Sequence, residues 1–339
     1  MTLKTNILSA MLIISAALAS CSKEGKGGEY AESTYEITFA PTLSAEAVPS
    51  KAGLYDSGNI IDEEHHGNFS VIAYKSGTKT RHFLDPERVY YMYYQDAPEE
   101  SRWRFYDNSD FYSRYWPQTY ALDFIAYMPW DLAGCPASFS KEEQTFSCTL
   151  PLDKSGQDSA QELIIAYNTG EKYTEAGKGK VSLDFRHPFT AVSFMLGEAH
   201  GNTEIHKVGL TGMFCSGTYD VPGGKWSNSE TSGDLKGDMD IAISKTVGTA
   251  GDSGIQLNSL IGGPYLVIPQ QTDGIKISIS FTWNSTRKDA EVSIGNGTWQ
   301  PGFIYTYKLN LGDNDEDILA DVIVEEWNAV KHKHEIEVE

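Results

Sequence analysis

Few cysteines, few positive charges and no long apolar run in the body set the first limits on this chain. Its 339 residues include only four cysteines, and their spacing does not form the knuckles that bind zinc. Beyond residue 20, no run reaches the 18 apolar residues of a membrane-spanning helix. The net charge is −20, with 27 Lys and Arg against 47 Asp and Glu. Such a charge repels nucleic acids, so we expect no nucleic-acid partner.

Patterns typical of catalysis and cofactor binding are also missing. No Gly-x-Ser-x-Gly elbow occurs, and the glycine pairs lack the residues of a P-loop or a dinucleotide fingerprint. The acidic stretch Asp313–Asp317 imitates the start of a calcium loop but lacks its Gly and its final Glu. The histidine groups at His65-His66 and His332-Lys333-His334 have no further ligand nearby. We expect no enzyme activity, no cofactor and no metal.

The first 20 residues have the pattern of a secretory signal peptide. Lys4 precedes an apolar segment that ends in small residues. Leu18-Ala19-Ser20-Cys21 resembles the bacterial lipobox, in which the cysteine carries the lipid; the alternative is an ordinary signal peptide followed by an accidental cysteine. We therefore predict that Cys21 is acylated, that residues 21–34 form a flexible tether, and that the protein is anchored to a membrane without spanning it.

Three cysteines remain after Cys21, which is an odd number for an oxidising compartment. Cys135 and Cys148 flank a segment that can fold back as a hairpin and bring them within reach of each other. We predict a disulfide between these two as one of two alternatives. The other is that Cys135, Cys148 and Cys215 are all buried free thiols.

Alternating apolar residues predict an all-β fold. Aromatic residues make up 12% of the chain and glycine occurs 31 times, which suits strands joined by tight turns. The two cleanest alternations lie in residues 275–283 and 303–311. The length favours two domains, and the glycine-rich run Ala176–Lys180 suggests a boundary near residue 180. We expect β-sandwich domains at 35–180 and 181–339.

Several segments, in order, resemble motifs of the Bacteroidetes fimbrillins, the subunits of type V pili. They are Tyr115-Trp116-Pro117 with Leu122–Pro129, Val181–Phe194, Gly217–Asp220 with Trp226, Tyr265–Gln270, Trp299–Tyr307, and Trp327. The resemblance implies two transthyretin-like β-sandwich domains and export as an outer-membrane lipoprotein. It also implies a fimbrial subunit or accessory adhesin whose partners are other fimbrial subunits and a host or bacterial surface receptor.

In the polymerising members of that family, an Arg- or Lys-specific protease releases the first strand, and a strand of the next subunit fills the gap by β-strand addition. Here the segment Tyr35–Leu43 is the candidate first strand, with Tyr35, Ile37, Phe39 and Pro41 on one face. Lys51, in a loop-like stretch beyond it, is the candidate cleavage site. The tail Glu335–Glu339 alternates as a donor strand does, but it has only two apolar residues.

Two further expectations concern carbohydrate. Asp158-Ser159-Ala160 resembles the acceptor of Bacteroidetes O-glycosylation, so Ser159 is a candidate modification site. The aromatic runs at 90–94 and 103–116 contain rings that can stack on sugars. A surface glycan-binding lipoprotein, binding through Trp103 or Trp116, is therefore the alternative to a fimbrial protein.

Overall fold

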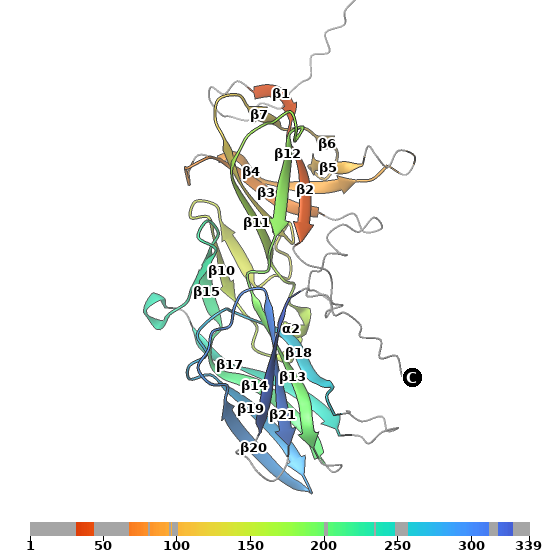
Figure 1. Ribbon diagram of the computed structural model, residues 1–339, viewed down its shortest axis with the longest axis vertical. Helices are drawn as coiled ribbons and strands as arrows, with labels where there is room; N and C mark the ends of the chain where they lie inside the picture. Colours follow the sequence, from red (N-terminus) through yellow and green to blue (C-terminus); the bar gives the residue numbers. More distant parts are fainter. Residues whose placement is uncertain are drawn as a thin grey trace, which may run out of the picture. The chain divides into compact units, whose positions relative to one another are not determined.

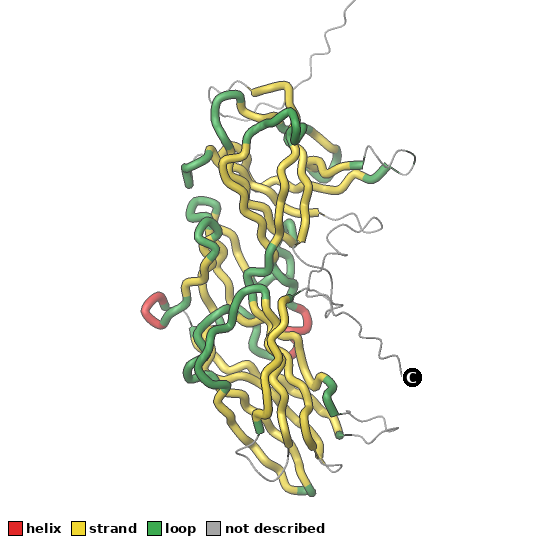
Figure 2. The backbone as a smooth tube through the Cα atoms, viewed as in Figure 1, coloured by secondary structure: helices red, strands yellow, loops and turns green. Residues whose placement is uncertain are grey.

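The computed structural model describes residues 32–43, 68–80, 82–94, 96, 101–199, 203–233, 235–247, 257–311 and 318–327. All of them belong to one compact unit, Glu32–Glu339. Figures 1 and 2 show a chain built mostly of strands. In the described part, the only α-helix is α2 (Lys154–Ser159), and one 3₁₀ helix covers Glu230–Ser232. The prediction of a mostly β fold is confirmed.

The largest sheet combines strands from residues 38–185 in the order β11-β8-β3-β4-β5-β2-β12, with β6 paired to β5. Its strands are β2 (Thr38–Leu43), β3 (Asn68–Lys75), β4 (His82–Met92), β5 (Arg102–Tyr106), β6 (Phe111–Tyr112), β8 (Leu122–Met128), β11 (Ile164–Glu171) and β12 (Lys180–Phe185). Beside it, β1 (Glu32–Glu36) pairs with β7 (Tyr115–Pro117).

Two four-stranded sheets from the second half share one core. Their orders are β18-β13-β21-β22 and β17-β14-β19-β20. Both contribute to a single cluster of buried apolar side chains, including Phe194 and Phe281. The strands are β13 (Thr190–Ala199), β14 (Thr203–Phe214), β17 (Lys236–Thr246), β18 (Leu260–Val267), β19 (Lys276–Trp283), β20 (Thr286–Ser293), β21 (Phe303–Leu311) and β22 (Leu319–Glu326).

The alternations that predicted strands in the second half are confirmed. β19 buries Ile277, Ile279 and Phe281, while the residues between them face the other way. β21 buries Tyr307 and Leu309 in the same manner. These side chains point to one face because successive residues of a strand alternate between the two faces of a sheet.

A third four-stranded sheet joins segments from both halves of the chain. Its order is β16-β15-β10-β9, and β10 pairs with β15 over five residues. The strands are β9 (Ala137–Ser140), β10 (Thr145–Thr149), β15 (Ser216–Asp220) and β16 (Lys225–Ser227).

The chain continues in the large sheet beyond the boundary expected near residue 180. β12 begins at Lys180 and runs parallel to β2, with Phe185 opposite Leu43. Val181 and Leu183 of β12 are fully buried in the same core cluster as the first-half strands. They fit there because the alternation in Val181–Phe185 supplies one apolar face. The division at residue 180 stays a prediction, while this sheet extends to Phe185.

A buried polar pair lies close to the end of the last strand. The carboxylate of Glu162 contacts Nδ1 of His187, and both side chains are at least 90% buried. The His187 ring stacks on Trp327, with 4.8 Å between ring centroids. Trp327 immediately follows β22. Burial of polar groups is costly unless they are paired. The Glu162–His187 pair and the stacked Trp327 ring therefore hold together three segments that are distant in sequence.

Candidate functional site: the β2 slot

Strand β2 occupies an inner position of the large sheet but is held unequally on its two sides. On one side it pairs with β12 in parallel over six consecutive residues, from Thr38 opposite Lys180 to Leu43 opposite Phe185. On the other side its pairing with β5 consists of one residue pair, Phe39 opposite Trp103. The backbone ladder with β12 therefore provides most of the main-chain attachment. We call the space that β2 fills, between β5 and β12, the β2 slot.

Two further main-chain hydrogen bonds hold the backbone at the start of β2. The Ile37 N–H donates to the carbonyl of Arg114 at 2.8 Å, and the Thr38 N–H donates to the carbonyl of Gly179 at 3.0 Å. Gly179 has a φ of +75°, and a Cβ there would lie 2.2 Å from the carbonyl oxygen of Glu36. Only glycine lets the two backbones approach this closely.

Side chains of β2 and the residue before it fill the core of the large sheet. Ile37 is 1% exposed and Phe39 is 3% exposed. The Phe39 ring meets three other aromatic rings edge to face, with centroid distances of 5.6 Å to Phe69, 5.5 Å to Phe105 and 6.2 Å to Phe124. Each fully buried apolar side chain of this size stabilises the strand by about 1.5–3 kcal/mol. Phe39 is therefore the main anchor of β2.

The predicted inward face is confirmed for Ile37, Phe39 and Pro41, but not for Tyr35. Tyr35 is 47% exposed, and its ring stacks on Tyr173 with 3.7 Å between centroids. The reason is that the strand is interrupted at Ile37, so Tyr35 belongs to β1, which pairs with β7 and not with the large sheet. Tyr35 and Tyr173 line a cavity of about 300 Å³ beside Trp116.

A polar network surrounds Glu36, just before β2, and the sequence pattern did not predict it. The Ser113 hydroxyl donates to the Glu36 carboxylate at 2.7 Å, and Arg104 donates to the Ser113 oxygen at 3.2 Å. Nearby, Arg114 pairs with Glu87 at 2.7 Å. Alternation identified the apolar side of these strands, whereas pairing between their polar sides depends on register, which the local pattern does not contain.

Some candidate residues lie outside the described part of the chain. They are Cys21 with its leader, Lys51, the donor tail Glu335–Glu339, the acidic stretch Asp313–Asp317 and the histidines at 65–66 and 332–334. Among the described residues, no group of three or more His, Cys, Asp or Glu side chains is placed to hold a metal ion. The described helices include none long and apolar enough to cross a membrane.

The expected hairpin between Cys135 and Cys148 is present, and both cysteines are free thiols in the structure. β9 and β10 form the hairpin, with Cys148 opposite Ala137. Cys148 is buried, Cys135 is half-buried, and burial raises the pKa of the Cys135 thiol to about 12. Burial also raises the pKa of Cys148. The disulfide between them stays a prediction.

This burial predicts slow thiol chemistry in the folded protein. The thiolate is the reactive form, and at pH 8 a raised pKa keeps Cys135 and Cys148 protonated. We expect reduced, folded protein to react with iodoacetamide at these two positions at least about a hundredfold more slowly than urea-unfolded protein. Peptide mass spectrometry over time measures both rates. Equal rates in the two states would contradict the buried environment.

Ser159, the candidate glycosylation site, is the last residue of helix α2. Its side chain is exposed, and its hydroxyl donates to the carbonyl of Ser155 at 2.8 Å. Asp153 caps the start of the helix by accepting a hydrogen bond from the Gly156 N–H. Glycosylation of Ser159 stays a prediction.

The two tryptophans named for sugar binding are core residues. Trp103 is 4% exposed and Trp116 is 1% exposed, and the Trp116 indole N–H donates to the Gly179 carbonyl at 3.2 Å. Neither ring presents a face on which a sugar can stack. The expectation that they bind glycans is wrong, because alternation along β5 and β7 points both side chains inward.

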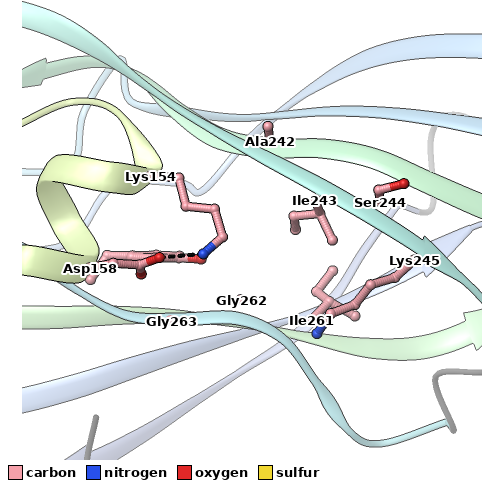
Figure 3. A pocket seen from close by; sticks show the side chains of 10 residues that line it. Lys154, Asp158, Ala242, Ile243, Ser244, Lys245, Ile261, Gly262 and Gly263 are labelled. Carbon is pink, nitrogen blue, oxygen red and sulfur yellow. Dashed lines mark hydrogen bonds and ion pairs between the residues drawn. The ribbon is translucent and has the colours of Figure 1, made fainter. Parts of the chain in front are cut away.

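A second cavity lies between α2, β17 and β18 and has a volume of about 440 Å³. Figure 3 shows Lys154 and Asp158 of α2 on one side, joined by an ion pair, and Lys245 of β17 on the other. Ile243 and Ile261 contribute apolar surface. We call it the α2 cleft.

A fimbrillin-like family model matches residues 63–327, while no curated protein sequence matches. Similar solved structures include candidate cell adhesion proteins from Bacteroides uniformis (14% identity, TM-score 0.49, covering 86% of this chain and 99% of that one) and Bacteroides ovatus (13%, 0.49, 88% and 99%). Another is the C-terminally truncated tip fimbrial protein Mfa3 from Porphyromonas gingivalis (8%, 0.45, 86% and 100%).

These structures are too distant to support an argument about function, so the assignment depends on the family model. That model covers most of the described residues, including β3 to β22 and the strands that form both sides of the β2 slot. The chain belongs to the fimbrillin-like family.

Proposed function

We propose that the protein is a fimbrial subunit or accessory adhesin, exported as an outer-membrane lipoprotein and exposed on the cell surface. Membership of the fimbrillin-like family, a structural family without enzymatic activity, supports this proposal. In it, Cys21 carries the lipid, residues 21–34 are the tether, and the partners are other fimbrial subunits and a surface receptor.

Assembly proceeds by exchange of strand β2. Cleavage after Lys51 separates β2 from the rest of the chain, so that only non-covalent contacts hold it. The observation that carries this step is the unequal attachment of β2, with a full ladder to β12 and one residue pair to β5. Once β2 leaves, Phe69, Phe105 and Phe124 lose the Phe39 ring and an open ladder remains. A strand from another subunit then fills the slot.

The two-domain architecture belongs to the same proposal. It consists of two transthyretin-like β-sandwich domains, at 35–180 and 181–339; β2 and β5 lie in the first domain, and most of β12 lies beyond residue 180. The common core of the two second-half sheets supports the second sandwich. Strand β12, which lies across the boundary, ties the first sandwich to the start of the second.

Anchoring through Cys21 predicts that Cys21→Ala releases the protein from the membrane. Several acyl chains, at about 0.8 kcal/mol per buried methylene, hold a protein stably, whereas none are attached without the thiol. Fractionation after a high-salt wash and labelling with a palmitate analogue measure the effect. Ser22→Ala is the matched control and stays in the membrane fraction. A labelled Cys21→Ala protein in the outer membrane would contradict the lipoprotein assignment.

Glycan capture remains the alternative function. The burial of Trp103 and Trp116 removes the two side chains that were its best support. A polysaccharide array tests it directly, since sub-millimolar binding to a glycan favours capture over assembly. Polymerisation after proteolysis favours the fimbrial role.

A further inference from the structure

The α2 cleft lies along the seam between two edge strands. β17 is the first strand of one sheet and β18 the first strand of the other, so each has one ladder partner among the described strands, β14 and β13 respectively. Edge strands present main-chain groups that can pair with a further strand. A seam with an edge on both sides is therefore a place where an additional strand can bind.

Residues 152–158 close one end of this seam. The Asp240 N–H of β17 donates to the Leu152 carbonyl at 2.9 Å. On the β18 side, the Gln157 side chain accepts from the Leu266 N–H at 2.9 Å and donates to the Leu266 carbonyl at 3.1 Å. The segment thus satisfies both edges at this end. Beyond it the seam continues as the open α2 cleft.

The open part has an apolar floor, and its charged rim residues, Lys154, Asp158 and Lys245, carry a net charge of +1. Ile243 and Ile261 are 7% and 2% exposed, and both line the cavity. Lys154 is half-exposed and pairs with Asp158, while Lys245 is exposed and has no ion pair among the described residues. Figure 3 shows the two lysines on opposite sides of the cleft. On a chain of net charge −20, a local excess of positive charge favours an acidic occupant.

The geometry favours a short strand that pairs with β17. Pro264 of β18 has no N–H to donate, and Gly263 has a φ of +101°, which departs from strand geometry. β17 has neither obstacle from Ala242 to Lys245. A strand beside it places alternate residues toward the floor and the residues between them toward the rim. The occupant should therefore alternate apolar and acidic side chains.

We propose that residues Glu335–Glu339 of the same chain dock in the α2 cleft as a short strand beside β17. Ile336 and Val338 contact Ile243 and Ile261, and the three glutamates remain at the rim with the lysines. These residues lie outside the described part of the chain, and their sequence, Glu-Ile-Glu-Val-Glu, has the required alternation. The β2 slot suits them less, because it receives Ile37, Phe39 and Leu43, three large apolar side chains.

The connection is long enough for docking within one chain. β22 and β18 are at opposite edges of one four-stranded sheet, three strand spacings or roughly 14 Å apart. Along the strands, Glu325 is level with Leu266, so Trp327 lies roughly 10–18 Å from the level of the cleft residues Tyr265 and Ile261. Together these two components give a direct distance of roughly 17–23 Å. The eight residue steps from Trp327 to Glu335 span up to about 28 Å when extended. Two apolar side chains make a weak contact between separate molecules, but a tether of this length supplies an effective concentration in the millimolar range.

Hydrogen–deuterium exchange of the full-length protein tests the docking. In the wild type we expect amides of 242–245 to exchange roughly tenfold more slowly than in the Ile336→Asp/Val338→Asp variant, because docking closes the edge of β17. Val330→Asp, outside the alternating segment, is the control and leaves the exchange unchanged. Equal exchange in the wild type and the double variant would overturn the proposal. So would protection that increases with protein concentration, which would indicate docking between molecules.

Charge reversal separates docking from a change in folding. Lys245→Glu should remove most of the protection, and adding Glu335→Lys, Glu337→Lys and Glu339→Lys to the same protein should restore at least a threefold slowing of exchange. Lys225→Glu, an exposed lysine on the β15–β16 hairpin, serves as the control for net charge. Loss of protection without rescue would contradict the assigned contacts. The docking is independent of strand exchange, because it does not involve the β2 slot.

Discussion

Phe39→Ala is expected to lower the free energy of unfolding by about 3–5 kcal/mol, the cost of removing a buried phenylalanine from a core. The side chain is 3% exposed and contacts the rings of Phe69, Phe105 and Phe124. Its loss leaves a cavity among three rings that are attached to different strands and cannot all move inward. Urea unfolding followed by tryptophan fluorescence measures the change, since Trp103 belongs to the same cluster.

Tyr35→Ala is the matched control for this prediction. Tyr35 lies four residues earlier on the same segment but is 47% exposed, so its removal should cost less than about 1 kcal/mol. A small effect for Phe39→Ala, similar to that for Tyr35→Ala, would mean that β2 is not anchored by the ring. The slot would then have no apolar requirement for an incoming strand.

Cleavage after Lys51 is expected to convert monomers into SDS-resistant polymers. The cut leaves β2 held by its ladder to β12 and its buried side chains, so release is slow and polymers accumulate over hours to days. Purified precursor is treated with a Lys-specific protease, the new N-terminus at Ala52 is confirmed by sequencing, and ladders are sought by electrophoresis without boiling. Lys51→Gln protein under the same conditions should remain monomeric.

A peptide of residues 32–43 provides a sharper control for the same experiment. In excess, it should reoccupy the slot and suppress the ladders, whereas the same peptide with Phe39→Ala should suppress them far less, because it lacks the anchor side chain. Polymers that form equally in the presence of either peptide would show that assembly uses another surface. A clean cut at Lys51 that yields only soluble monomer would argue for a tip, anchor or capture role.

Local sequence pattern predicted which side chains of β2 face inward but not which strands lie beside it. Alternation at Ile37, Phe39 and Pro41 was visible directly. The parallel pairing with β12 joins residues about 140 positions apart, and nothing in either strand specifies that partner. β12 begins at the boundary expected near residue 180, and that boundary stays a prediction.

The aromatic residues show the same limit at the level of single side chains. Trp103 and Phe105 alternate with Arg102 and Arg104, which indicates one buried face, yet a tryptophan at a strand position fits both a core and a binding surface. The burial of Trp103 in the structure identifies it as a core residue. The α2 cleft was not predicted at all, because it depends on two edge strands and on the Gln157 side chain of a short helix.

The N-terminus of the protein in isolated fimbriae tests the central proposal most directly. If the protein is a subunit assembled by exchange of strand β2, mass spectrometry of the assembled protein will find a chain that begins at Ala52, without lipid and without residues 32–43. A fimbrial chain that begins at an acylated Cys21 and retains residues 32–43 would contradict strand exchange at the β2 slot.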